Sequence, residues 1–113
     1  MNLKTEQDGA FLVLQLSGNL DAFAVQEIRQ DIENLMQSSG QTFLVDGSHI
    51  GLIDSSGIGY LVHLFKTAQG QGDRLALVGL NGQADDMMRF LKIDQVVPYF
   101  ADLKQAKEQL LEG

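Results

Sequence analysis

The sequence predicts an α/β fold: a mixed, mostly parallel sheet of about five strands that alternates with four helices. Continuous apolar runs typical of buried strands alternate along the chain with stretches in which apolar residues recur every three or four positions. This order repeats, so it predicts successive strand–helix–strand units with parallel strands. A hydrophobic fraction of 44% and a charged fraction of 20% are ordinary for a folded domain. We expect residues 1–113 to form a single domain.

The first half of the chain predicts three strands and one helix. Residues Ala10–Leu16 are almost all apolar, which indicates a strand buried on both faces. The preceding Leu3–Gln7 segment is expected to pair with it as a short antiparallel edge strand. A helix capped by Asp21 should run through Met36 and end at Ser38-Ser39-Gly40. The next strand is expected at Thr42–Asp46.

The second half repeats the pattern. A helix over Gly57–Gln69 should be followed by a strand at Arg74–Gly79, and a third helix should begin near Asn81. The segment Val96–Phe100 contains a proline, which cannot donate into a central ladder, so we expect a short edge strand there. Asp102 is placed to cap a last helix.

The charge balance limits the classes of partner. Fifteen acidic residues against eight basic ones give a formal net charge of −7, and the basic residues are scattered along the chain. Nucleic acid and anionic membranes would be repelled, so a protein with a basic face is the expected partner. The chain lacks cysteine and any apolar run long enough to cross a bilayer. We therefore expect a cytoplasmic protein.

The segment Asp54-Ser55-Ser56-Gly57 places an acid, two hydroxyls and a glycine where a loop should become a helix. One interpretation is structural, because Asp or Ser at such a position caps the free amide groups of the helix. The other is functional, because a phosphate on a serine here would meet the positive end of the helix dipole and unpaired N–H groups. Composition alone leaves both interpretations open.

Serine hydrolase chemistry would use the same hydroxyls. A nucleophile elbow needs Gly-x-Ser-x-Gly, but around Ser55 the first glycine position is occupied by Ile53. The available bases are His49, upstream in a predicted loop, and His63, on the predicted helix, and neither has an obvious orienting partner. The sequence therefore favours a protein that is not an enzyme.

Other sites fit less well. Asp46 ends a predicted strand like the phosphoacceptor of a response regulator, but no acidic pair follows the first long strand, and Asp85-Asp86 falls on a predicted helix. The segment 47–51 lacks the spacing and the lysine of a P-loop. A metal site at His49 would need a second histidine at ligand spacing, so we expect neither metal nor cofactor.

Two segments and the strand–helix order between them resemble a known family. Leu16-Ser17-Gly18-Asn19-Leu20-Asp21 and Asp54-Ser55-Ser56-Gly57-Ile58-Gly59 are similar to the STAS domain, specifically to the small stand-alone bacterial anti-sigma factor antagonists. The resemblance spans essentially the whole chain. It implies a phosphorylation-switched binding protein that, when unphosphorylated, captures an anti-sigma factor serine kinase and releases the sigma factor. A PP2C-type phosphatase would restore that form.

The resemblance also assigns roles to individual residues. The first hydroxyl of the motif, Ser55, would be the phosphoacceptor, and this choice over Ser56 rests on the resemblance alone. Asp21 and Asp54 would be its acidic neighbours. The partner-binding surface would consist of these two aspartates together with Ser56, Gly57, Ile58, Gly59, Tyr60 and Leu61. We expect a monomer or weak dimer.

One position departs from the family pattern. Gly47 stands where the central strand usually continues with an apolar residue, and it is followed by polar Ser48 and His49. Other STAS domains serve as scaffolds or as subunits of larger assemblies that phosphorylation does not switch. That alternative stays open, with Ser55 as a structural cap.

Overall fold

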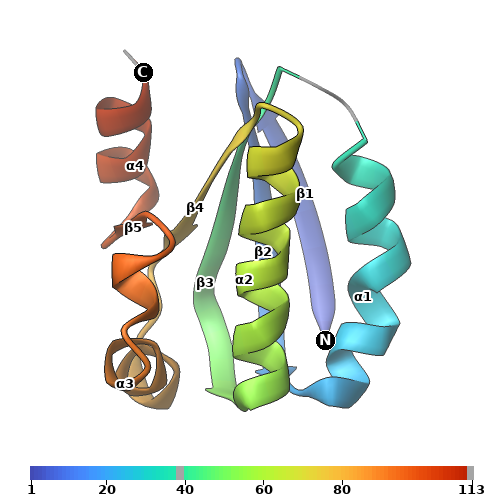
Figure 1. Cartoon of the computed structure of the whole chain (residues 1–113), viewed down its shortest axis with the longest axis vertical. Coiled ribbons are helices and arrows are strands. Elements are labelled where there is room, and N and C mark those ends of the chain that lie inside the picture. The colour runs from blue at the N-terminus through green and yellow to red at the C-terminus, as the bar shows by residue number, and fades with distance from the viewer. Residues whose placement is uncertain (38–39, 112–113) are drawn as a thin grey trace.

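The computed structural model describes residues 1–37 and 40–111. Five strands form one sheet whose order follows the chain: β1 (Asn2–Asp8), β2 (Phe11–Leu20), β3 (Thr42–Ile53), β4 (Arg74–Val78) and β5 (Tyr99–Phe100). The first pair is antiparallel and the other three are parallel. The predicted mixed, mostly parallel sheet is therefore confirmed (Figure 1).

Four α-helices separate or follow the strands: α1 (Ala22–Leu35), α2 (Ser55–Gly70), α3 (Gly82–Phe90) and α4 (Leu103–Leu110), with a 3₁₀ turn at Ile93–Gln95. The predicted caps Asp21 and Asp102 are confirmed, because each carboxylate accepts a hydrogen bond from the backbone N–H three residues later. Ser38 and Ser39, where α1 was expected to end, lie outside the described residues.

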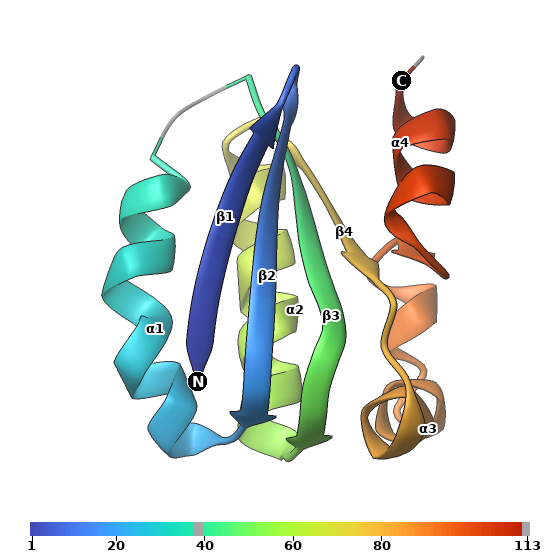
Figure 2. The same ribbon diagram turned by 180° about the vertical axis from the view of Figure 1, so that it is seen from behind.

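Three of the four α-helices pack on one face of the sheet. Helices α1, α2 and α3 contribute buried residues to the same large apolar cluster as Leu12, Phe43 and Leu75 of the central strands. The alternate strand residues, including Phe11 and Leu44, face the other way and pack with Ala106 of α4. Viewed from behind, no helix lies over β1 and β2 (Figure 2).

Two predicted strand ends were wrong. β2 continues to Leu20 rather than Leu16, and β3 continues to Ile53 rather than Asp46. The extra segments pair with each other with two irregularities in register, between Gln15 and Ser17 and between Gly18 and Leu20. These irregularities interrupt the alternation of apolar and polar residues that would have predicted strands in these segments. Smaller shifts occur at β5, which begins at Tyr99, and at α2, which begins at Ser55.

The unusual Gly47 has a packing partner. A β-carbon at this position would collide with a terminal methyl group of Leu80, from the loop after β4, and would lie 3.2 Å from the Ile50 side chain. Leu80 is itself buried. The departure at Gly47 therefore leaves room for the Leu80 side chain above the middle of β3.

Candidate functional site

The site lies where β2 and β3 end and α1 and α2 begin, at one end of the molecule (Figure 1). Leu20 and Ile53, the last residues of the two strands, are register partners. The backbone N–H of Asp54 donates to the carbonyl oxygen of Leu20 at 3.3 Å. This bond holds the start of α2 beside the start of α1.

Asp54 caps α2, whereas the sequence had left the capping residue open among Asp54, Ser55 and Ser56. Its Oδ1 accepts a hydrogen bond of 2.9 Å from the N–H of Gly57, and its backbone carbonyl accepts from the N–H of Ile58 at 3.0 Å. The N–H groups of Ser55 and Ser56 lie in the first turn, where no earlier helix carbonyl can reach them. Both serines are exposed. The helix end therefore presents two free donors and two hydroxyls to solvent.

Gly57 is required by the packing. A β-carbon here would collide with the carbonyl oxygen of Leu20 and would lie 2.8 Å from Cγ1 of Ile53. The carbonyl belongs to the backbone of the neighbouring strand, so it cannot swing away as a flexible side chain could. Gly57 thus sets the close approach between α2 and the end of β2.

Two amide side chains that sequence reasoning missed brace the end of β3. Asn19 Oδ1 accepts from the N–H of Leu52 at 3.0 Å. Gln83, in the first turn of α3, both accepts from the N–H of Ile53 at 2.8 Å and donates to its carbonyl oxygen at 2.9 Å. Asn19 lies within a segment singled out earlier, whereas nothing in the sequence marks Gln83. Together they fix the strand immediately before Asp54.

The structure brings together only part of the predicted binding surface. Asp21, Asp54, Ser55, Ser56 and Gly59 are exposed on the first turns of α1 and α2 or just before them. The other four predicted contact residues are buried, namely Gly57, Ile58, Tyr60 and Leu61. These four residues lie beneath the exposed ones, and Tyr60 also lines a pocket between α1 and α2.

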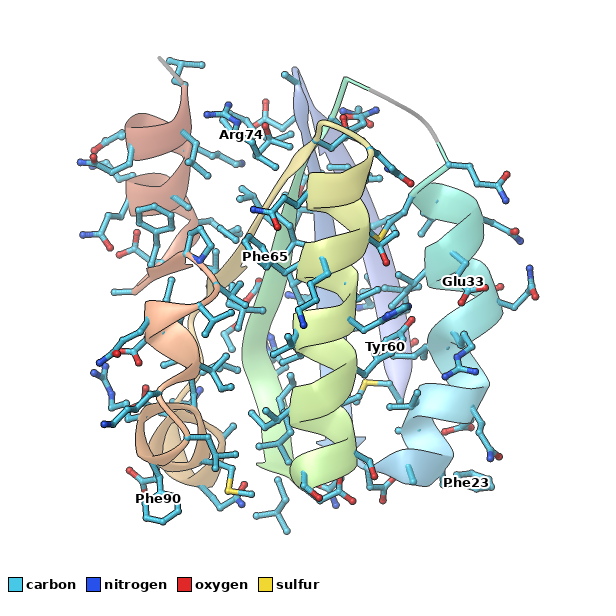
Figure 3. The ribbon with its side chains drawn as sticks, viewed as in Figure 1. Phe23, Glu33, Tyr60, Phe65, Arg74 and Phe90 are labelled. Atoms are coloured by element: carbon cyan, nitrogen blue, oxygen red, sulfur yellow. The ribbon has the colours of Figure 1, made fainter. Side chains whose placement is uncertain are left out.

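Large exposed side chains lie near this end of the molecule and were not predicted. Phe23, in the first turn of α1, is 70% exposed, and Leu52, just before Asp54, is 57% exposed. Phe90 at the end of α3 is 82% exposed. Figure 3 shows Phe23 and Phe90 on either side of the end at which α2 begins. Large exposed aromatic and aliphatic side chains are typical of a protein-binding surface.

Tyr60 lies between α1 and α2 (Figure 3). Its hydroxyl is buried and has no hydrogen-bond partner among the described residues. Burial, together with the nearby charge of Glu33 and against the opposing charge of Arg29, raises the pKa of Tyr60 to about 12. The phenol is therefore neutral at physiological pH and is a hydrogen-bond donor.

The two histidines considered as catalytic bases are placed elsewhere. His49 lies on β3, where its Nδ1 is 3.1 Å from the hydroxyl of Ser48 and 3.4 Å from the side-chain nitrogen of Gln15. The ring of His63 stacks on Tyr60, with centroids 6.2 Å apart. Within the described part of the chain, no group of three or more His, Asp or Glu residues could hold a metal ion.

Comparison with known proteins decides the family. The STAS domain matches residues 2–106. The chain belongs to the STAS family. The resemblance seen in the two sequence motifs is thus confirmed, and the strand order and helix placement described above are those of a STAS domain.

Relatives of this STAS chain carry a consistent description. A protein named anti-sigma-B factor antagonist from Listeria monocytogenes is 25% identical over 88 residues, which is 78% of this chain and 75% of the relative. An anti-sigma factor antagonist from Mycobacterium paratuberculosis has a similar fold, with a TM-score of 0.88, 16% identity, and coverage of 96% of this chain and 92% of that one.

A third comparison is with a phosphorylated protein. The Bacillus cell fate determinant SpoIIAA in its phosphorylated form matches with a TM-score of 0.71 and 20% identity, covering 96% of this STAS chain and 99% of that one. At this identity the likeness shows the fold alone. Across residues 1–37 and 40–111, no helix has the length and apolar character needed to span a membrane.

Proposed function

We propose that this STAS protein is an anti-sigma factor antagonist: a cytoplasmic, non-enzymatic binding protein that docks on an anti-sigma factor serine kinase until Ser55 is phosphorylated. The observation that carries the proposal is the exposed Ser55 in the first turn of α2, at a helix end that is held in place but open to solvent. The name of the Listeria relative supports the same role.

The helix end favours a phosphate on Ser55. The free N–H groups of the first turn and the positive end of the helix dipole would offset part of its charge, so the modified protein stays folded. The same phosphate adds about −1.5 to −2 charges beside Asp54 at the start of α2. A partner that covers this surface would have to desolvate that dianion, and therefore binds only the unmodified form.

The proposed docking surface combines a small polar centre with apolar anchors. Ser55, Ser56 and Gly59 are exposed at the centre, and Phe23 and Leu52 are exposed at its edges. Buried apolar anchors supply most of the affinity at protein interfaces. The net charge of −7 favours a partner with a basic face. A PP2C-type phosphatase would reset the switch.

The first test is labelling with radioactive ATP and an anti-sigma factor serine kinase from the same organism. Wild type and Ser56→Ala should both take up label, whereas Ser55→Ala should take up none. The two serines are neighbours on one exposed turn, so Ser56→Ala is a matched control. Undiminished labelling of Ser55→Ala would refute the assignment.

The second test separates a switch from a scaffold. The scaffold alternative took Ser55 as a structural cap, but the cap of α2 is Asp54, whose carboxylate accepts from the N–H of Gly57. A switch predicts that Ser55→Asp loses at least about tenfold in kinase affinity, a difference of about 1.4 kcal/mol. Ser55→Ala should bind like wild type. Circular dichroism should show both variants folded. Equal affinity of all three proteins would support the scaffold.

A further inference from the structure

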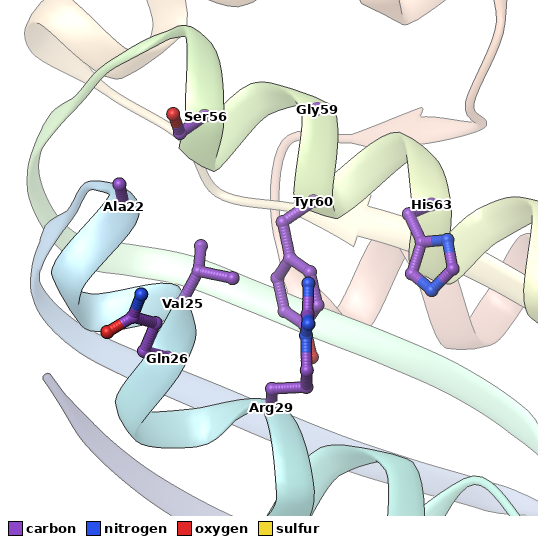
Figure 4. A pocket seen from close by; sticks show the side chains of 8 residues that line it. All are labelled: Ala22, Val25, Gln26, Arg29, Ser56, Gly59, Tyr60 and His63. Carbon is purple, nitrogen blue, oxygen red and sulfur yellow. The ribbon is translucent and has the colours of Figure 1, made fainter.

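A pocket of about 440 Å³ lies between α1 and α2, next to the proposed docking surface, with which it shares Ser56 and Gly59. Its volume falls within the range of small-molecule sites. It begins at Ser56 and extends along the two helices to His63 (Figure 4). The lining consists of Ala22, Val25, Gln26 and Arg29 from α1 and Ser56, Gly59, Tyr60 and His63 from α2.

The polar groups around this pocket lack protein partners. Among the described residues the buried Tyr60 hydroxyl has no acceptor, an arrangement that is costly unless something else supplies one. Within residues 1–37 and 40–111, the guanidinium of Arg29 forms no ion pair and no hydrogen bond. The phenol stays protonated at neutral pH because its pKa is raised to about 12. The site thus offers donors that lack acceptors.

The charge of the lining is unusual for this protein. The whole chain has a net charge of −7, yet the lining contains Arg29 and neither Asp nor Glu. Glu33 is near enough to raise the pKa of Tyr60 but does not line the pocket. An anionic group that accepts hydrogen bonds suits both Arg29 and Tyr60.

The aromatic and apolar side chains that line the pocket indicate the shape of the part of the ligand that is not anionic. The rings of Tyr60 and His63 are stacked with an angle of 27° between their planes, and Val25 adds an apolar contact on the α1 side. The exposed Gly59 has no other atom within 4 Å of where a β-carbon would stand. Flat, partly apolar groups pack well against such surfaces.

We infer that the pocket binds a small planar carboxylate, a site that does not depend on phosphorylation of Ser55. The Arg29 guanidinium pairs with the carboxylate in the two-pronged geometry that this side chain favours. One carboxylate oxygen accepts from the Tyr60 hydroxyl. Arg29 is exposed and near enough to Tyr60 to influence its pKa, so Arg29 turns aside to admit the ligand. Exposed side chains change rotamer in nanoseconds or less.

The test is a titration of ¹⁵N-labelled protein with benzoate, followed by the amide signals in two-dimensional NMR. Benzoate should shift the signals of Gln26, Arg29, Gly59 and His63 saturably, with an affinity on the order of millimolar, as expected for a ligand of this size. Benzamide has the same shape without the charge, and should bind at least about tenfold more weakly.

Three variants complete the test. Arg29→Gln and Tyr60→Phe should each weaken benzoate binding at least about fivefold, with spectra otherwise unchanged. Glu33→Gln should strengthen binding, because it removes a nearby negative charge. Equal binding of benzamide, unchanged benzoate affinity in Arg29→Gln, or the lack of any saturable shift in the wild type would each overturn the inference.

Discussion

The N-termini of α2 and α4 use the same capping device in different surroundings. Asp54 and Asp102 each accept a hydrogen bond from the backbone N–H three residues on, at 2.9 and 2.8 Å. The first turn of α2 also packs closely against the end of β2 at Gly57. The first turn of α4 lies at the periphery, and that helix buries only Ala106.

The difference between the two helices shows how much a capping residue in the sequence can and cannot indicate. A capping residue before an apolar pattern shows where a helix begins, and it does so equally well at both places. It does not show whether the helix end is held rigidly against a neighbour. At α2 the sign of a rigidly held helix end is Gly57, which packs against Leu20 at the end of β2 and Ile53 at the end of β3. A site that must present one serine in a fixed position needs a helix end that is held rigidly against its neighbours.

The largest effect is expected from Gly57→Ala. The added β-carbon meets the Leu20 carbonyl and the Ile53 side chain, so the free energy of unfolding should fall by about 2–3 kcal/mol, as for an overpacked core. Urea denaturation followed by circular dichroism measures this loss. A loss below about 0.5 kcal/mol would mean that the start of α2 is not fixed by this contact.

Removing the caps should distinguish the two helices. Asp54→Ala should lower the free energy of unfolding by about 1–2 kcal/mol, and Asp102→Ala by about 0.5–1 kcal/mol, because the Asp54 bond is partly buried and the Asp102 bond is exposed. Hydrogen exchange should show loss of protection confined to α4 in Asp102→Ala. Equal losses at both caps would remove the energetic basis of the comparison.

Gly59→Ala provides the matched opposite of Gly57→Ala on the same helix. Apart from the adjacent residues and the backbone of α2 itself, no atom lies within 4 Å of the new β-carbon, so stability should rise by about 0.5–1 kcal/mol through better helix propensity. Because Gly59 is exposed on the proposed docking surface, kinase affinity should fall at the same time. Urea denaturation and a binding titration on one preparation measure both. Destabilisation would contradict the open space seen at this position.

The two tyrosines extend the comparison to hydrogen bonding. The Tyr99 hydroxyl donates to the carbonyl oxygen of Leu80 at 3.1 Å, whereas the Tyr60 hydroxyl has no partner among the described residues. Tyr99→Phe should therefore lower the free energy of unfolding by about 1 kcal/mol, whereas Tyr60→Phe, which removes an unpaired buried hydroxyl, should raise it by about 1 kcal/mol at neutral pH. A loss of stability in Tyr60→Phe would show that its hydroxyl is paired in solution.

The raised pKa of Tyr60 gives a dependence on pH. The unfolded chain loses this proton near pH 10.0 and the folded protein near pH 12. The folded state binds more protons in that interval, so the contribution of Tyr60 to stability is complete below pH 10.0 and declines as the pH rises to 12. Unfolding curves of Tyr60→Phe should fall less steeply over this range than those of wild type.

Most of the fold could be predicted because its signals are local. Apolar runs, helical periodicity and turn residues indicated all five strands and four α-helices, though not all of their bounds, and capping residues placed the starts of α1 and α4. The second half of β3 could not be predicted, because Gly47-Ser48-His49 looks like a loop. Its strand character comes from pairing with the end of β2, which is more than twenty residues away.

The sequence likewise predicted the local part of the site but not its long-range contacts. The sequence indicated that a helix begins near residues 54–57 and that a serine is displayed there, but not that Asp54 is the cap. The bracing by Gln83 joins positions 30 apart and has no local pattern. The burial of Tyr60 could not be inferred either, because it depends on α1 lying beside α2.

The contact between Gly47 and Leu80 links two positions that are distant in the sequence. Since a β-carbon at position 47 and a leucine at position 80 compete for one space, a change at one should be compensated at the other. Among STAS chains, the pair should therefore vary together: glycine with a large side chain, or an apolar residue with a small one. That reciprocal pattern would identify the subgroup to which this chain belongs.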